Sequence, residues 1–187
     1  MPKGLVGLSY LRGKTMVYSV SNARTPGTSY RYEVLDPGQE AIPTGRQITF
    51  ADTQGVDLNG FTLPELVTFK SFDGVEIPAF LFLPPGYQKG TKIPFVANYH
   101  GGPEGQEVPS FRADYQALVA QGIAVFAPNV RGASGFGKRF VNLDNGALRR
   151  DGVRDIEACV EYVVRAAVAD PRRIGITELF VTPPAAE

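Results

Sequence analysis

The segment with the clearest chemical potential is His100-Gly101-Gly102-Pro103, which we call the glycine loop and which follows an apolar run at 95–99. Two adjacent glycines let the backbone turn sharply and leave amide hydrogens exposed, with no Cβ in the way. Amides presented in this way can stabilise the oxyanion that forms during acyl transfer. We therefore take Gly101 and Gly102 as oxyanion-loop candidates, with His100 and Pro103 as residues that shape the loop. A plain turn after a strand is the alternative.

A nucleophile and its general base are not evident in the sequence. His100 is the single histidine, and a base must lie within hydrogen-bond reach of a nucleophile and be oriented by a third group. Ser134 lies among glycines, but Gly132-Ala133-Ser134-Gly135-Phe136 lacks the final glycine of a Gly-x-Ser-x-Gly elbow. We interpret Ser134 as a turn serine and His100 as a loop-shaping residue, and we predict no catalytic residue in the chain.

A metal or a cofactor is also not expected. One cysteine, Cys159, and one histidine cannot form a zinc cluster, and Cys159 has no partner for an internal disulfide. The glycines at 132, 135 and 137 do not have the spacing of a dinucleotide fingerprint or a phosphate loop. We expect Cys159 to be a small packed residue.

Arg131 is a fixed cation directly after a second apolar run. A guanidinium can hold a carboxylate in a bidentate pair. The carboxylate could belong to a substrate or to a structural acid such as Asp151 or Asp155. We favour the internal salt bridge, and so a structural role for Arg131.

Charge and hydropathy exclude several classes of partner. Lys and Arg total 19, as do Asp and Glu, so no excess positive charge is available to hold nucleic acid. No stretch approaches the roughly 20 apolar residues that cross a bilayer, and the first residues do not read as a signal peptide. We expect no nucleic-acid or membrane partner and a cytoplasmic location.

The elements that must position these residues fall into two compositional halves. Up to Gly60, β-branched and aromatic runs at 15–20 and 29–34 are separated by Pro and Gly turns, which indicates antiparallel hairpins.

The second half begins at Leu66, where a hairpin at 67–71 and 79–83 is followed by buried strands at 95–99 and 123–127. Helical spacing joins Phe111, Tyr115, Leu118 and Val119, and a second helix carries Val153, Ile156, Val160, Val163 and Val164 on one face. Asp170-Pro171 predicts a turn before a strand at Ile174 and Ile176. This alternation predicts an α/β fold with a parallel sheet.

Four further segments strengthen this interpretation. They are Ser71-Phe72-Asp73-Gly74, Leu83-Pro84-Pro85-Gly86, Asn129-Val130-Arg131-Gly132-Ala133-Ser134-Gly135-Phe136-Gly137-Lys138 and Asp170-Pro171-Arg172-Arg173-Ile174-Gly175-Ile176. With the glycine loop, they make residues 66–176 resemble the catalytic domain of the prolyl oligopeptidase family of serine peptidases, and most closely its acylaminoacyl and dipeptidyl peptidase branches. The resemblance implies the N-terminal part of an α/β-hydrolase sheet at 61–176. The residues at 1–60 are similar to the last strands of the β-propeller that precedes that domain.

The resemblance ends where the family places its nucleophile. Family members continue from this strand into a Gly-x-Ser-Tyr-Gly-Gly elbow and act on short peptides with Ser, Asp and His, whereas residues 177–187 read TELFVTPPAAE. We therefore expect a peptidase fragment truncated before its nucleophile, inactive alone, with an aberrant tail at 177–187 that does not form a helix. Two alternatives stay open: a split peptidase completed by another chain, and a non-enzymatic interaction module. Because truncation would expose the edge of the strand at 174–176, we expect aggregation, or a complementary fragment or chaperone as partner.

Overall fold

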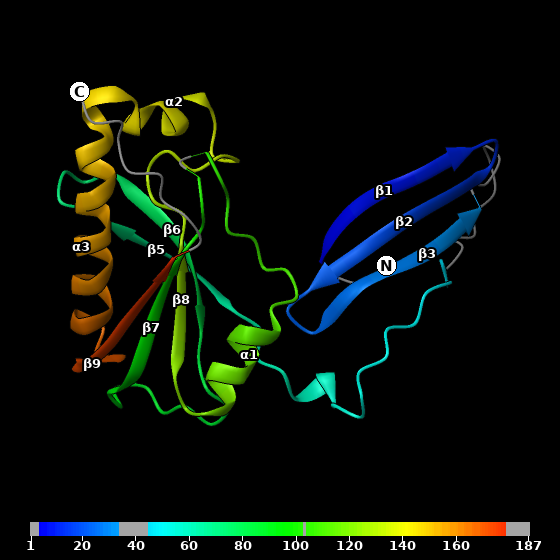
Figure 1. The fold of residues 1–187 in the computed structure, drawn as a ribbon, viewed down its shortest axis with the longest axis horizontal. Coiled ribbons are helices and arrows are strands. Elements are labelled where there is room, and N and C mark those ends of the chain that lie inside the picture. Colours follow the sequence, from blue (N-terminus) through cyan, green and yellow to red (C-terminus); the bar gives the residue numbers. More distant parts are fainter. Residues whose placement is uncertain (1–3, 34–44, 103, 179–187) are drawn as a thin grey trace. The chain divides into compact units, whose positions relative to one another are not determined.

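The chain folds into two units, each built around one sheet, in a computed structural model that describes residues 4–33, 45–102 and 104–178 (Figure 1). The first unit comprises the described parts of residues 1–63 together with 109–113. The second comprises the described parts of 64–108 and 114–187. The division lies three residues beyond the boundary expected from the sequence, and the short 109–113 segment rejoins the first unit.

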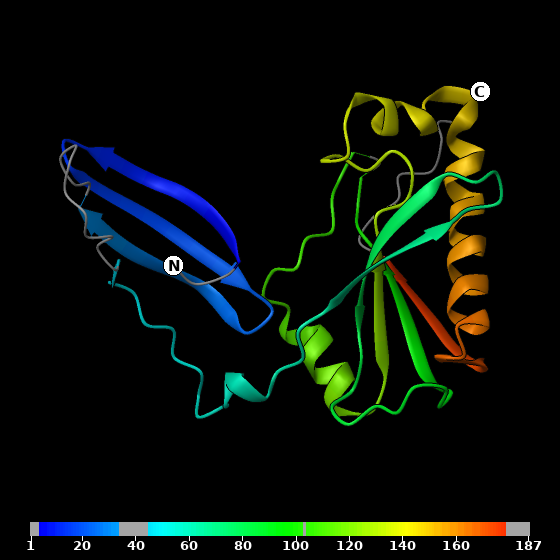
Figure 2. The ribbon, with the colours of Figure 1, turned by 180° about the vertical axis from the view of Figure 1, so that it is seen from behind.

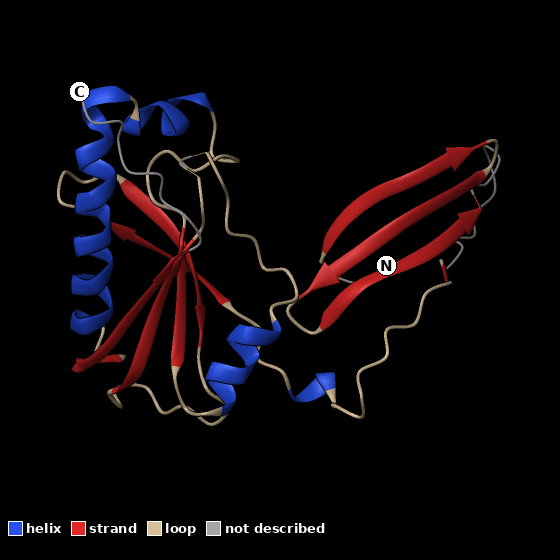
Figure 3. Ribbon diagram, in the orientation of Figure 1, coloured by secondary structure: helices blue, strands red, loops and turns tan. Residues whose placement is uncertain are grey.

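The first unit is an antiparallel sheet of four strands in the order β1-β2-β3-β4 (Figure 3). Its strands are β1 (Leu5–Arg12), β2 (Thr15–Asn22), β3 (Thr25–Glu33) and β4 (Arg46–Gln47). Tyr18 and Val20 of β2 are buried, and Tyr18 stacks on Tyr30 with ring centroids 5.4 Å apart. The side chains of β1 are all exposed, and its register with β2 shifts between Leu8 and Tyr10. That shift breaks the alternation that marks a strand, so the sequence predicted β2 and β3 but not β1.

The second unit is a mixed sheet of five strands in the order β5-β6-β8-β7-β9. Its strands are β5 (Glu65–Lys70), β6 (Glu76–Phe82), β7 (Ile93–Tyr99), β8 (Ala124–Pro128) and β9 (Ala169–Glu178). The predicted hairpin is confirmed as β5 and β6, whose turn contains Gly74 at a φ of 86°. Strand β7 runs parallel to both β8 and β9. The predicted α/β fold is therefore correct.

Three α-helices belong to the described part of this unit: α1 (Ala113–Ala120), α2 (Lys138–Val141) and α3 (Arg149–Arg165). Helix α1 connects β7 to β8, and α3 connects β8 back to β9 on the other side of β7. Right-handed crossovers in opposite directions place their helices on opposite faces of a sheet. Figures 1 and 2 show α1 and α3 in this arrangement. None of the described helices is long and apolar enough to cross a membrane.

The core of this unit lies between α3 and the sheet. All five residues of β8 are buried, as expected of a strand covered on both faces. Aromatic rings form the centre of the core: Phe126 of β8 lies 6.0 Å from the ring of Phe69, 5.9 Å from that of Phe95 and 6.0 Å from that of Tyr162.

Helices α1 and α3 differ in detail from the two helices predicted from the sequence. Phe111 precedes α1 and stacks on Phe61 in the first unit, with centroids 5.9 Å apart, so it is not part of the helical stripe. Val153 of α3 is 62% exposed, whereas Asp155 is fully buried. The prediction of the buried face relied on apolar side chains, and it was wrong at these positions because an ion pair takes Asp155 into the core.

The predicted turn at Asp170-Pro171 is instead an irregularity inside β9. The pairing of β7 with β9 passes from Ile93↔Ala169 to Phe95↔Ile174, so β9 has extra residues there. Proline has no amide to give to the ladder, and the Asp170 carboxylate accepts a hydrogen bond from the Arg172 amide at 3.0 Å. Of the predicted tail, 177 and 178 belong to β9 and 179–187 lie outside the described residues.

Candidate functional site

The glycine loop leaves the carboxyl end of β7. Because β7, β8 and β9 are parallel, their carboxyl ends lie at one edge of the sheet, where ligands bind in open α/β folds. Gly102 is exposed and has a φ of 67°. Among the described residues, none accepts a hydrogen bond from the amides of Gly101 or Gly102. Pro103 lies outside the described residues.

Residues 104–107, which we call the return segment, bring the chain back against the glycine loop. The Gly105 amide donates to the Gly102 carbonyl oxygen at 3.2 Å, and the Ser134 amide donates to the Gly105 carbonyl oxygen at 3.0 Å. A Cβ at position 105 would collide with the carbonyl oxygen of Gly101 and with Nδ1 of His100. Gly105 is thus required by this close approach, a role that nothing in the sequence pattern indicates.

Asn129 anchors the end of the return segment. It follows β8 and is fully buried. Its Oδ1 accepts from the Glu107 amide at 2.8 Å, and its Nδ2 donates to the Glu107 carbonyl oxygen at 3.1 Å. In the sequence, Asn129 begins the motif at 129–138, and that motif alone gives it no role. The signal was present, because a polar residue at the end of a buried strand needs partners for both its amide atoms.

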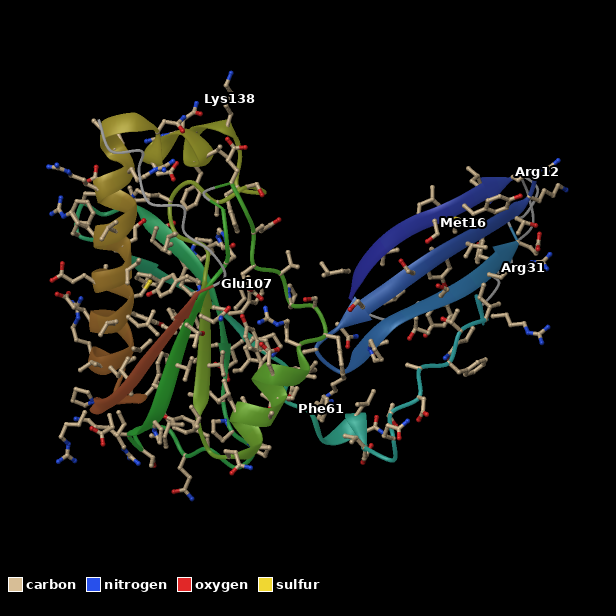
Figure 4. The ribbon with its side chains drawn as sticks, viewed as in Figure 1. Arg12, Met16, Arg31, Phe61, Glu107 and Lys138 are labelled. Atoms are coloured by element: carbon tan, nitrogen blue, oxygen red, sulfur yellow. The ribbon has the colours of Figure 1, made fainter. Side chains whose placement is uncertain are left out.

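A buried polar network lies beside this anchor. The hydroxyl of Tyr115, on α1, donates to Oδ1 of Asn98 at 2.5 Å and lies 3.4 Å from Oε2 of Glu107. Asn98 in turn donates to Oγ1 of Thr177 on β9 at 2.7 Å. Figure 4 labels Glu107 among the side chains of this unit. The network joins β7, α1, the return segment and β9 close to the edge that carries the glycine loop.

Arg131 lies in a second polar cluster. Its Nε and Nη2 donate to the two oxygens of Asp155 at 2.9 and 2.8 Å, and Nη1 and Nη2 donate to those of Asp73 at 2.9 Å each. Ser71 adds a hydrogen bond of 2.5 Å from Oγ to Asp155. Burial opposes the charge on Arg131, but the hydrogen bonds to Asp73 and Asp155 raise its pKa above the ordinary value. The carboxylates that Arg131 holds are therefore those of the chain itself.

This cluster ties three separate segments together. Asp73 is in the β5–β6 turn, Arg131 follows β8, and Asp155 is on α3. The hydrogen bond from Arg131 lowers the pKa of Asp73, so the pair stays ionised at neutral pH. Asp151 lies farther away, with an oxygen 3.9 Å from Nη1 of Arg131. Of the two acids considered from the sequence, the buried Asp155 makes the closer contacts with Arg131.

Gly132 and Gly137 allow a matched test of the segment after β8. Both have a φ near 90° (94° and 90°), but a Cβ at Gly132 would collide with the buried carboxylate of Asp144, whereas Gly137 faces open space. Backbone strain alone should cost Gly137→Ala about 1–3 kcal/mol. Gly132→Ala should cost about 1–3 kcal/mol more, because it also overpacks a buried site. Urea unfolding of both variants measures the difference in stability. Equal losses of stability would contradict the close approach of Gly132 to Asp144.

His100 is partly buried within the loop, and neither ring nitrogen has a hydrogen-bond partner among the described residues. In that part of the chain, therefore, no hydrogen bond joins His100 to a serine. Burial lowers the pKa of His100, with an opposing contribution from the backbone of Gly101 and Gly102.

Burial raises the pKa of Cys159 to about 12, which makes Cys159 an inert thiol at neutral pH.

The shift at His100 predicts a pH dependence of stability. An unfolded histidine binds a proton near pH 6.5, whereas the folded one resists protonation until the pH is lower. The unfolded state then binds more protons, so the free energy of unfolding should fall as the pH drops below about 6.5. His100→Gln should remove this component of the acid-side slope. Urea midpoints between pH 7.5 and 5 test this, and an unchanged slope in the variant would refute it.

No group of three or more His, Cys, Asp or Glu side chains that could hold a metal ion occurs within residues 4–33, 45–102 and 104–178. The groups that the described residues bring to the carboxyl ends of these strands are backbone amides on a glycine-rich turn, whose return segment is held by a buried asparagine. Such a turn suits a developing negative charge.

Comparison with known proteins points to one family. Residues 109–177 match the model of the prolyl oligopeptidase family. The uncharacterized peptidase YuxL of Bacillus subtilis strain 168 is 32% identical over 141 residues, which cover 73% of this chain and 22% of that protein. Dipeptidyl-peptidase 5 of Porphyromonas gingivalis is 31% identical over 108 residues, covering 57% and 16%. The chain thus spans about a fifth of the length of these relatives.

Solved structures agree with the fold. A prolyl endopeptidase aligns with a TM-score of 0.81 at 20% identity, over 95% of this chain and 26% of the other. The acylaminoacyl peptidase of Pyrococcus horikoshii aligns with a TM-score of 0.68 at 24% identity, over 95% and 28%. An acylaminoacyl peptidase in complex with Z-Gly-Gly-Phe-chloromethyl ketone is 26% identical, with a TM-score of 0.66 over 92% and 26%.

Proposed function

Residues 109–177 belong to the prolyl oligopeptidase family, and on that premise we propose that this chain is the part of a serine-type peptidase that opens its hydrolase domain. In that role it supplies one half of an oxyanion hole and no nucleophile. The substrates of the whole peptidase would be short peptides. The first unit, by its place before this domain, would be the end of a β-propeller.

The observation that carries this proposal is the glycine loop at the carboxyl end of β7. Gly102 is exposed, and its amide has no acceptor among the described residues. In α/β hydrolases, one oxyanion donor comes from a loop after an early strand and the other from the residue after the nucleophile. The parallel strands β7, β8 and β9 place the loop at the edge of the sheet where such a site would be completed.

A polypeptide of these 187 residues should be inactive by itself. The sequence has one histidine, and that histidine lies in the glycine loop without a hydrogen bond to a described serine. An activated serine needs an adjacent base. Assays with chromogenic dipeptide and acylamino-acid substrates should give no turnover above that of a Ser134→Ala variant. Turnover that disappears in Ser134→Ala would contradict the proposal.

A split peptidase is the second candidate, and the position of β9 favours it. Among the described residues β9 is the last strand in the sheet order, and Ile176 is 56% exposed. An open strand edge is a template for pairing with another chain. If the nucleotide sequence after codon 187 encodes the rest of a hydrolase in a separate frame, co-expression of the two polypeptides should give peptidase activity that neither shows alone.

An interaction module without activity is the remaining alternative. It predicts a chain that binds a chaperone or another protein along the unpaired side of strand β9. Size-exclusion chromatography and urea unfolding test whether β9 needs a partner chain. A soluble monomer with one cooperative unfolding transition would argue against that need.

A further inference from the structure

We propose that Asn129 is a positioning residue for the glycine loop: its buried side-chain amide fixes the return segment and so holds the backbone amides of Gly101 and Gly102 in position. This inference rests on the proposed role of the glycine loop as an oxyanion donor. It concerns a residue that touches neither glycine directly and acts through Glu107.

Asn129 is held by the rigid part of the sheet. Its backbone amide donates to the Pro78 carbonyl oxygen at 2.8 Å, which continues the pairing of β6 with β8 by one residue. The side chain is fully buried. Since both strands belong to the packed core, the amide of Asn129 has a fixed position from which to bind another segment.

The amide of Asn129 binds the backbone of Glu107 as a neighbouring strand would. It accepts from the Glu107 N–H and donates to the Glu107 C=O, at 2.8 and 3.1 Å. Glu107 is itself buried. Without Asn129, the N–H and C=O of this buried residue would lose these two hydrogen bonds, and losing hydrogen bonds in a buried position is costly. The end of the return segment is therefore held at this point.

A second, separate contact from the segment after β8 holds the return segment beside the glycine loop. The Ser134 amide, five residues after Asn129, donates to the Gly105 carbonyl oxygen at 3.0 Å, and the Gly105 amide donates to the Gly102 carbonyl oxygen at 3.2 Å. The return segment is thus bound at Glu107 and at Gly105 by the segment that follows β8. Because the Gly102 carbonyl oxygen is hydrogen-bonded to the Gly105 amide, the direction of the Gly102 amide depends on where Gly105 is held.

Amide hydrogen exchange on the full chain, followed by NMR, tests the inference without relying on catalysis. In Asn129→Ala the Glu107 amide loses its acceptor directly, so the informative amide is that of Gly105, which does not bond to Asn129. We expect its exchange to accelerate about tenfold or more, with shifted amide signals of Gly101 and Gly102. Exchange in the β5–β6 hairpin should stay close to wild type. Asn142→Ala, at an exposed asparagine of the 3-10 helix Asn142–Asp144, is the matched control.

If Asn129→Ala does not fold, Gly105→Ala breaks the same arrangement at its other end, because its Cβ would collide with the Gly101 carbonyl. Gly152→Ala, where a Cβ has contacts no closer than 3.8 Å, is its control. Unchanged Gly105 exchange in Asn129→Ala, or unchanged Gly101 and Gly102 signals in Gly105→Ala, would overturn the proposal. So would equal acceleration across the whole second unit. Because no activity is measured, a failure of the oxyanion role would appear separately, in the peptidase assay of the completed enzyme.

Discussion

Asp155→Ala is expected to destabilise the second unit by about 3–5 kcal/mol, because it leaves the buried guanidinium of Arg131 without its closest carboxylate. Asp155 is fully buried and accepts hydrogen bonds from the backbone amide, Nε and Nη2 of Arg131 and from Oγ of Ser71. A domain of this size is stable by only about 5–15 kcal/mol, so the variant should unfold at a much lower urea concentration.

Asp151→Ala is the matched control for that experiment. Its carboxylate is 30% exposed and lies 3.9 Å from Nη1 of Arg131. Partly exposed pairs of this kind contribute about 0–1 kcal/mol. If the two variants lost equal stability, the buried pair would not have the importance assigned to it here.

Phe126→Ala should have an effect of similar size in the apolar core. The Phe126 side chain is fully buried on β8, and its ring lies within 6.0 Å of the rings of Phe69, Phe95 and Tyr162. Removing a buried phenylalanine ring costs about 3–5 kcal/mol through lost burial and the cavity that remains.

Phe136→Ala provides the comparison. Phe136 is 39% exposed and contacts one aromatic ring, that of Phe140, with centroids 5.4 Å apart. Its loss should cost under about 1 kcal/mol, in the range of surface substitutions. Thermal unfolding of both variants measures the difference, and a Phe136 variant as unstable as the Phe126 variant would contradict this description of the core.

Much of the second unit could be predicted from sequence because its elements have strong local signals. Strands β7 and β8 are short apolar runs, and the β5–β6 hairpin surrounds an Asp-Gly turn. Strand β1 was missed because its register shift removes the alternating pattern. The buried face of α3 was misassigned because a carboxylate, Asp155, lies in it. Asp155 is buried because it forms an ion pair with Arg131, 24 residues earlier in the chain, and no local sequence pattern indicates that pair.

The candidate site divides in the same way. The glycine loop could be located from two consecutive glycines after an apolar run. The contacts that hold it could not, because Asn129 and Glu107 are 22 residues apart, and Asp73 and Arg131 are 58 apart. Gly105 gives a similar case, since the need for glycine there comes from the folded-back loop and not from a turn motif. The roles of Gly101, Gly102 and His100 stay predictions.

We propose that these 187 residues carry an oxyanion donor but no activated serine. Intact-mass analysis after treatment with a serine-directed fluorophosphonate tests it most directly, with an active serine hydrolase as the positive control and a denatured sample of the chain as the background. We expect the 187-residue chain to keep its unmodified mass under conditions that label the control completely. Stoichiometric addition of one phosphonyl group to the folded chain, absent when the chain is denatured before treatment, would show that an activated serine is present.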